Sequence, residues 1–425
     1  MKVFKFGGAS IKDANAIKNV VSIIQQFATE CPLIVVSASG KTTNALEIVV
    51  NEYFAETDKA FEALELVKQQ HFSLIKDLFE GIDATAVLAE VNDIFVDVEW
   101  ILEERPEDGY DYVYDQIVCA GELLSTKIVA AYLNASAIPC NWLDVRDCIL
   151  TDDTYRDANV EWEETTKRIV RIVPALREKG LVITQGFLGT TTENATTTLG
   201  REGSDFTAAI FSYCLNAESM TIWKDVPGVL TADPRIFEDV VLMDKISYKE
   251  AIEMTYYGAQ VIHPKTLRPL QNKHIPMYVK SFVHPENPGT IVCDEDIETY
   301  PPVIVVKPGQ ALLKIVSKSF YFVDEMRFSL LFDAFARHRI KVNMTQNTAL
   351  AFSVCVDFDA RKIAGLKAEL LEEYELSVIE NLKLITIRHT TPEMLDRFAK
   401  DRKLYLDERI RETTQLVMNA AEILI

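Results

Sequence analysis

The sequence of 425 residues has no C-x-x-C pair, no G-x-G-x-x-G motif and no apolar run of membrane length. Its seven cysteines are scattered and odd in number, which excludes a simple zinc ribbon and is typical of a reduced protein. We also expect no signal peptide before the first apolar strand. These absences predict a cytoplasmic protein with no membrane partner.

Positive charge is scarce as well. The chain has 44 Lys and Arg against 64 Asp and Glu, a formal net charge of −20, which argues against nucleic acid or an anionic membrane as a partner. If the substrate is an anion, the cationic side chains that bind it must be gathered in one part of the molecule. The candidates are Lys5, Lys41, Arg201, Lys224, Arg235 and Lys265.

Short apolar strands alternate with helical patterns over the first 290 residues. The predicted strands lie at 3–6, 33–36, 138–143, 181–185, 220–224 and 277–281. Residues 45–105 are predicted to form a helical excursion, that is, a helical segment inserted between strands. A further helix is expected at 117–133. This alternation predicts an α/β domain with a mostly parallel sheet, and the length predicts two or three domains in all.

The tail has a different organisation. Residues 284–302 are rich in proline and predict a boundary. The strand, helix, strand, strand and helix that follow are expected at 311–316, 324–338, 340–346, 349–357 and 362–371. This βαββα order is typical of a small ferredoxin-like module, and a partial second copy begins near 384–389.

The chain opens on a strand that ends in glycines. Lys5 and Phe6 run into Gly7 and Gly8, and Ser10 is expected to cap the next helix. A strand, a glycine turn and a helix N-terminus together make an anion site. The alternative is an ordinary turn with a solvated lysine.

Two further stretches carry polar groups at predicted element ends. Residues 37–44 contain Gly-Lys-Thr but are not a Walker A loop, because Val35 stands where the first glycine is needed. They leave hydroxyls and a lysine at a strand end, where open α/β sheets bind ligands. Glu122, near a helix start, either complements the helix dipole or receives a substrate ammonium.

The richest stretch is 184–209. A long Thr-rich loop at 190–198 leads into Leu-Gly-Arg-Glu-Gly-Ser-Asp at 199–205, and Ser204 or Asp205 is expected to cap the following helix. Arg201 can grip a carboxylate bidentately, and Asp205 can hold Mg²⁺ or orient a lysine. The loops at 223–235 are either held by salt bridges or face a nucleotide. Separately, Ser247 to Glu250 forms a capping box that predicts the start of a helix.

Four motifs occur together in a specific order: K-F-G-G-A-S at 5–10, L-G-R-E-G-S-D at 199–205, D-V-P-G-V-L-T-A-D-P-R at 225–235 and G-A-Q-V-I-H-P at 258–264. The ordered set resembles the aspartate kinase branch of the amino acid kinase family. The resemblance implies an amino acid kinase fold at 1–290. It also implies α+β ferredoxin-like ACT regulatory modules at 303–425. The first module spans about 308–380, and the second is short and degenerate.

The resemblance implies ATP- and Mg²⁺-dependent phosphorylation of the side-chain carboxylate of L-aspartate. Lys5 would stabilise the transferring phosphoryl group and Asp205 would organise the lysines or the metal. The residues implied for aspartate are Ser37, Thr43, Glu122 and Arg201. Those implied for the nucleotide are Gly7, Gly8, Ser10, Lys224, Asp225, Leu230, Arg235 and Lys265. A homodimer through the ACT-like modules is implied too, and without G-x-G-x-x-G we expect no fused homoserine dehydrogenase.

The sequence departs from the family pattern in three places. Ala9 stands where threonine is usual, and Glu202 where glycine is usual. Lysine-inhibited relatives offer carboxylates to the effector at places that here read Val342-Asn343 and Thr348-Ala349. We therefore predict weak or absent inhibition by lysine.

Two other functions stay open at this level. One is a kinase of the same superfamily acting on glutamate, N-acetylglutamate or a nucleoside monophosphate. Arg201 with Glu122 favours a free amino acid, since N-acetylation removes the ammonium. The other is a catalytically weak regulatory or ligand-binding subunit.

Overall fold

The computed structural model describes residues 1–259, 262–319 and 325–422, and the chain divides into two compact units. The first unit contains Met1–Val229, Leu242–Ile252 and Val261–Asp296. The second contains Leu230–Val241, Glu253–Gln260 and Ile297–Ile425.

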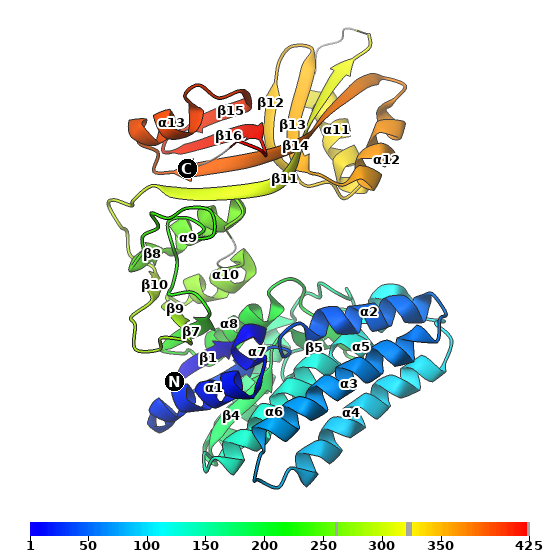
Figure 1. Cartoon of the computed structure of the whole chain (residues 1–425), viewed down its shortest axis with the longest axis vertical. Helices are drawn as coiled ribbons and strands as arrows, with labels where there is room; N and C mark the ends of the chain where they lie inside the picture. Colours follow the sequence, from blue (N-terminus) through cyan, green and yellow to red (C-terminus); the bar gives the residue numbers. More distant parts are fainter. Residues whose placement is uncertain (260–261, 320–324, 423–425) are drawn as a thin grey trace. The chain divides into compact units, whose positions relative to one another are not determined.

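An eight-stranded sheet forms the frame of the first unit (Figure 1). Its order is β3-β4-β2-β1-β7-β9-β10-β8, and every neighbouring pair except β9–β10 is parallel. The strands are β1 (Lys2–Phe6), β2 (Leu33–Val36), β3 (Cys140–Leu143), β4 (Leu181–Gln185), β7 (Ser219–Lys224), β8 (Lys245–Ser247), β9 (Met277–Ser281) and β10 (Thr290–Cys293). The predicted, mostly parallel sheet is confirmed. The apolar runs of β1 and β2 are buried on both faces, as strands covered by helices require.

Helices flank this sheet, and the predicted excursion is a bundle of long helices (Figure 1). The helices are α1 (Ala14–Gln26), α2 (Thr42–Phe54), α3 (Lys59–Leu78), α4 (Thr85–Glu103), α5 (Tyr110–Val118), α6 (Ala120–Ala135), α7 (Trp162–Arg177), α8 (Gly203–Cys214), α9 (Tyr248–Tyr256) and α10 (Pro264–Asn272). One continuous core joins the bundle to the sheet, with Phe4, Phe95 and Leu124 among its buried members.

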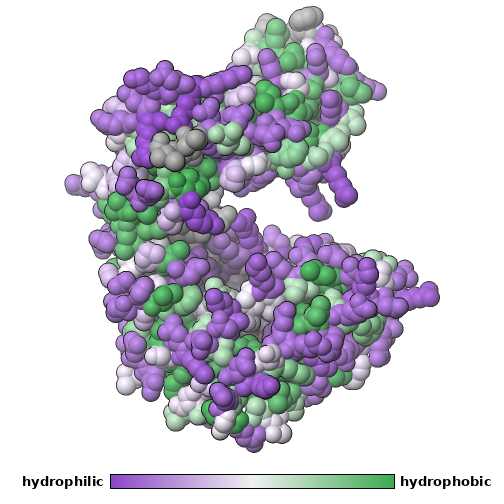
Figure 2. All heavy atoms as spheres, viewed as in Figure 1, coloured by the Kyte–Doolittle hydropathy of each residue, from purple (hydrophilic) through white to green (hydrophobic). Residues whose placement is uncertain are grey.

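The helical stretch Tyr110–Ala135 is long and apolar enough to cross a membrane by length and composition, but 78% of its apolar window is buried inside the structure. A core helix passes the same test, so this stretch is weak support for a membrane span. Hydrophilic residues cover most of the molecular face drawn in Figure 2, in keeping with the acidic composition.

Two predicted helix caps are wrong. Ser10 lies in a 3₁₀ turn, Gly8–Ile11, and α1 begins later, where the Asp13 carboxylate accepts a hydrogen bond from the Ala16 backbone N–H at 2.8 Å. Ser204 and Asp205 lie inside α8, because the turn before them already has helical bonding and Glu202 occupies the N-cap position.

One predicted segment also differs in type. The Thr-rich stretch 190–198 is mostly an antiparallel hairpin of β5 (Leu188–Thr190) and β6 (Thr196–Thr198), since β-branched threonines suit strands. The helix predicted at 117–133 is confirmed as α6, which α5 precedes and meets at Cys119.

The second unit is built on a six-stranded antiparallel sheet of order β12-β13-β11-β14-β16-β15. Its strands are β11 (Val303–Ser317), β12 (Val342–Asn347), β13 (Ala351–Asp357), β14 (Tyr374–Arg388), β15 (Leu404–Ile410) and β16 (Thr413–Asn419). Its helices are α11 (Glu325–Arg337), α12 (Ala360–Leu370) and α13 (Pro392–Ala399). The predicted βαββα order is present from β11 to α12, although the predicted helix start, Asp324, lies outside the described residues.

The partial second copy consists of the end of β14 followed by α13, β15 and β16. The long strands β11 and β14 pair along both halves of the sheet, with a register shift between Lys307 and Gln310. Phe398 of α13 is fully buried and packs edge-on against Phe237, with 6.0 Å between the ring centroids.

Candidate active site

The carboxyl ends of β1, β2 and β7 open into a cavity of about 530 Å³ in the first unit. Carboxyl ends of parallel strands are where open α/β sheets bind ligands. The lining residues are Lys5, Gly8, Ser37, Ala38, Gly40, Thr43, Tyr114, Glu122, Arg156, Phe187, Gly200, Arg201, Glu202, Gly203, Ser204, Asp205 and Lys224. The cavity therefore combines four cationic side chains with three carboxylates.

Lys5 and Asp205 form a buried ion pair in this cavity. The Lys5 ammonium lies 2.7 Å from Asp205 Oδ1, and the two side chains are only 11% and 4% exposed. Burial disfavours the Asp205 carboxylate, but the charges of Lys5 and Lys224 outweigh it and hold its pKa below the ordinary value. Asp205 thus fixes Lys5 at the end of β1, and the charge of Lys224 further stabilises the Asp205 carboxylate.

Glu122 presents a different kind of carboxyl group. Its side chain is buried, and Oε1 accepts a hydrogen bond from the Ala38 backbone N–H at 3.2 Å. Oε2 is buried and has no hydrogen-bond partner within the described residues. Burial raises the pKa of Glu122 to about 8, against the Ala38 N–H and the charge of Lys5. Such a group suits the cationic end of a ligand.

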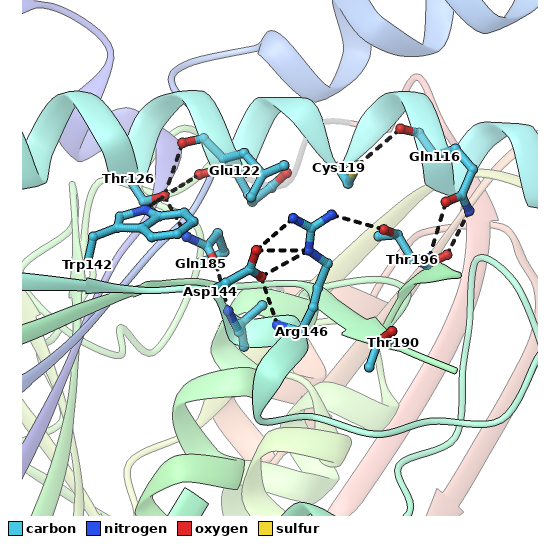
Figure 3. Close-up of polar contacts among 12 residues, drawn as sticks. Gln116, Cys119, Glu122, Thr126, Trp142, Asp144, Arg146, Gln185, Thr190 and Thr196 are labelled. Atoms are coloured by element: carbon cyan, nitrogen blue, oxygen red, sulfur yellow. Dashed lines mark hydrogen bonds and ion pairs between the residues drawn. The ribbon is translucent and has the colours of Figure 1, made fainter. Parts of the chain in front are cut away.

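A polar network anchors the helix that carries Glu122 (Figure 3). One turn further along α6, the Thr126 hydroxyl donates to the Glu122 carbonyl at 2.8 Å. The same oxygen accepts from Trp142 Nε1 at 3.0 Å and from Gln185 Nε2 at 2.8 Å. The ends of β3 and β4 therefore fix the rotation of α6, and with it the place of Glu122.

The turn at 199–205 has little room for side chains. A Cβ on Gly200, at φ 78°, would overlap the Asp157 carboxylate, and one on Gly203 would lie 2.6 Å from the Phe187 ring. Glu202 has a left-handed backbone, φ 55°, which favours glycine, and its Oε2 is buried without a hydrogen-bond partner within the described residues. The departure at Glu202 therefore combines an unfavourable backbone with a carboxylate that is not fully solvated.

Gly8 allows two ligand-side loops to touch. A Cβ at this position would lie 2.8 Å from the carbonyl oxygens of Ala38 and Gly40, and the Gly40 N–H donates to the Gly8 carbonyl at 3.0 Å. Only glycine fits this backbone-to-backbone approach. Ala9, by contrast, is exposed.

Eight of the fourteen residues predicted for the site line the cavity: Lys5, Gly8, Ser37, Thr43, Glu122, Arg201, Asp205 and Lys224. Gly7, Ser10, Asp225 and Lys265 belong to the same unit but do not line it. Ser10 is buried, and Lys265 forms an ion pair with Asp157. Leu230 and Arg235 belong to the second unit, where Arg235 pairs with Asp233 at 2.6 Å. Gln260 and Val261, in the fourth motif, lie outside the described residues.

Sequence reasoning missed Tyr114, Arg156 and Phe187, which also line the cavity. Tyr114 and Arg156 come from segments without a recognisable motif, whereas Phe187 lies in the stretch 184–209 but outside its Leu-Gly-Arg-Glu-Gly-Ser-Asp motif. Within residues 1–259, 262–319 and 325–422, no group of three or more His, Cys, Asp or Glu is placed to hold a metal ion.

The fold and the site define the class of protein. The chain belongs to the amino acid kinase family, whose sequence profile matches residues 1–281. Among curated relatives, it is 31% identical to lysine-sensitive aspartokinase 3 of Escherichia coli, over 91% of this chain and 86% of that protein.

The chain is also 34% identical to the chloroplastic bifunctional aspartokinase/homoserine dehydrogenase 1 of Arabidopsis thaliana, over 69% of this chain. It spans 33% of that protein, so the match covers about a third of the bifunctional relative's length.

Solved structures of E. coli aspartokinase III have the same fold over the whole chain. In complex with lysine and aspartate, that enzyme gives a TM-score of 0.84 at 27% identity, covering 100% of this chain and 97% of the other. In complex with aspartate and ADP, it gives 0.82 at 26% identity, covering 99% and 96%.

Proposed function

We propose that this chain is an aspartate kinase, which transfers a phosphoryl group from ATP to the side-chain carboxylate of L-aspartate and forms 4-phospho-L-aspartate. This reaction is the first step of the pathway to lysine, threonine and methionine. The observation that carries the proposal is a single cavity lined by Lys5, Arg201, Asp205 and Glu122. The names of the aspartokinase relatives support the same reaction.

The main barrier to this reaction is electrostatic. A carboxylate nucleophile is already ionised at neutral pH, so no general base is needed. It must approach a polyphosphate, and two like charges ~4 Å apart repel by about 4 kcal/mol at an effective dielectric of about 20. Lys5 and Lys224 offset that repulsion from the strand ends, with Asp205 holding Lys5 in position.

The amino-acid end of the cavity is matched to a free amino acid. Arg201 binds the α-carboxylate, and Oε2 of Glu122 accepts a hydrogen bond from the substrate ammonium. The hydroxyls of Ser37 and Thr43 complete this end. A substrate without an ammonium, such as N-acetylglutamate or UMP, would leave the buried Glu122 unpaired.

The nucleotide is ATP, bound with Mg²⁺. The glycine turn at 7–8, with Ser10, approaches the phosphates, and Lys224, Asp225 and Lys265 border the nucleotide. Leu230 and Arg235 are assigned to the nucleotide by motif alone. Mg²⁺ would arrive on the phosphates, with Asp205 as the candidate protein ligand from this cavity.

The second unit serves as an ACT-like regulatory region and as a homodimer contact. Met326 and Leu330, one turn apart on α11, are 75% and 57% exposed, an apolar pair that a second copy would cover. Light scattering on the full chain tests this: the wild type is expected to be a dimer, and Leu330→Glu to shift it towards monomer. An aqueous, reducing compartment such as the cytoplasm fits seven free cysteines.

An aspartate-dependent hydroxamate assay with ATP and Mg²⁺ tests the function. Activity is expected with L-aspartate, and little with glutamate. Coupled ADP-release assays should detect little activity with N-acetylglutamate or UMP. A chain that binds aspartate but releases no ADP would instead be a regulatory subunit.

A further inference from the structure

Arg156 lines the substrate cavity although no sequence motif points to it. It lies in the connection between β3 and α7, and its backbone is left-handed, with φ 69°. A long side chain is uncommon in this conformation, and non-glycine residues held in it cluster at functional sites. Phe187 and Glu202, with φ of 71° and 55°, are the other non-glycine residues lining the cavity that have such a backbone.

A buried carboxylate holds the Arg156 backbone in place. The Arg156 N–H donates to Asp115 Oδ2 at 3.0 Å. Asp115 is fully buried, and it also accepts from the Thr198 N–H at 2.9 Å and the Thr198 hydroxyl at 2.7 Å. Three hydrogen bonds to one buried carboxylate tie this strained residue to α5 and β6.

Aromatic rings hold the guanidinium. Its Cζ lies 4.3 Å from the centre of the Tyr114 ring and 5.5 Å from that of Tyr110. Its ion pairs are long and exposed, 3.6 Å to Glu47 and 3.3 Å to Asp111, on side chains that are 41% and 62% exposed. Pairs of this kind contribute little and are readily exchanged for a ligand.

The surroundings of Arg156 belong to the amino-acid end of the cavity. Glu47 lies one turn beyond Thr43 on α2, and the Arg156 carbonyl lies beside Gly200, next to Arg201. The phosphate end, with Lys5 and Asp205, has its cations on β1 and β7.

We propose that Arg156 is a specificity-determining residue that binds the α-carboxylate of the amino acid together with Arg201. This inference rests on the proposed function and adds a residue to it. A planar guanidinium stacked on Tyr114 is paired along its N–H edges only with the exposed carboxylates of Glu47 and Asp111, which a substrate carboxylate can displace. Two arginines bind a carboxylate more tightly than one.

The test compares Arg156→Gly with the wild type in a coupled ADP-release assay. Glycine suits the left-handed backbone, so the variant is expected to fold, and its resistance to urea should be equal or higher. Arg156→Asn, which also tolerates this backbone, serves as a second variant. Asp111→Asn is the matched control, because it removes one of the two exposed carboxylate partners of Arg156 and leaves the arginine in place.

Arg156→Gly is expected to raise the KM for L-aspartate about tenfold, with kcat and the KM for ATP within about twofold of the wild type. The ratio of kcat/KM for L-aspartate to kcat/KM for its α-amide should fall by a similar factor in the variant. The α-amide has no α-carboxylate for Arg156 to bind, so removing Arg156 leaves its KM unchanged. Asp111→Asn should leave the KM for aspartate unchanged or lower.

An unchanged KM for aspartate in Arg156→Gly would overturn the inference, and so would a rise confined to the KM for ATP. A structural role would instead lower kcat and urea resistance together and leave the preference over the α-amide intact. A wild type inactive with aspartate would defeat the proposed function itself. An active wild type with a normal Arg156→Gly defeats only the role of Arg156.

Discussion

The ammonium of Lys5 lies 2.7 Å from the Asp205 carboxylate, although the two residues are 200 positions apart in the sequence. Lys5 extends from the central strand β1, and Asp205 from the first turn of α8. The pair fixes a positive charge at the carboxyl end of the central strand, where the proposed phosphoryl transfer needs it.

Lys5→Ala should therefore lower both activity and stability. We expect kcat to fall by about 10²–10³-fold and the free energy of unfolding by about 3–5 kcal/mol, because the buried Asp205 carboxylate loses its partner. Steady-state kinetics and urea unfolding measure the two effects. Lys2→Ala, on the same strand, is the control, since its pair with Glu30 is exposed. A fully active Lys5→Ala would contradict the proposed role.

The affinity for aspartate should depend on pH through Glu122. With a pKa of about 8 it is mostly protonated at pH 7, and only its ionised form pairs with an ammonium. The KM for aspartate should fall as pH rises from 6.5 to 8.5, and Glu122→Gln should flatten the profile. The same profile in both proteins would assign the titration to another group.

Glu122 also links stability to pH. Its folded pKa lies above the ordinary value of about 4.3, so the folded state binds more protons than the unfolded chain between about pH 4 and 8. The free energy of unfolding should therefore decrease as pH rises through this window. Urea unfolding at pH 5.5 and 8.5 should give a smaller difference for Glu122→Gln than for the wild type.

Glu202→Gly should stabilise the protein by about 1 kcal/mol, because glycine adopts the left-handed backbone of residue 202 without strain. Urea unfolding measures this gain. Glu202→Gln keeps the strain and removes only the charge, so it should not reproduce the backbone part of the gain. A less stable Glu202→Gly would indicate that the glutamate side chain makes a stabilising contact.

Lysine is expected to inhibit weakly or not at all. In the second unit the Asn343 amide already donates to Gln310 Oε1 at 2.8 Å and to Asp357 Oδ1 at 2.9 Å. It also accepts from Lys307 Nζ at 2.8 Å, so a lysine of the chain itself occupies this polar cluster. Lysine titration of the aspartate-dependent activity measures the effect. Strong inhibition below 1 mM would contradict the prediction.

Much of the architecture is predictable because it depends on local pattern. The runs at β4 and β9 are short and apolar, and the structure has them at the predicted bounds. The caps were less predictable. Ser10 and Asp13 are both good capping residues, and Asp13 caps α1 because Ser10 lies within the 3₁₀ turn Gly8–Ile11.

The sequence alone determined the family, because the four ordered motifs and their glycines are local features that can be recognised without knowing how the chain packs. Only the tertiary structure decided which charged groups share the cavity. It brought Lys5 to Asp205, left Lys265 paired with Asp157, and added Arg156 from a stretch without a motif. The physical reason is that ion pairing and burial depend on distances between side chains far apart in sequence, which no local pattern encodes.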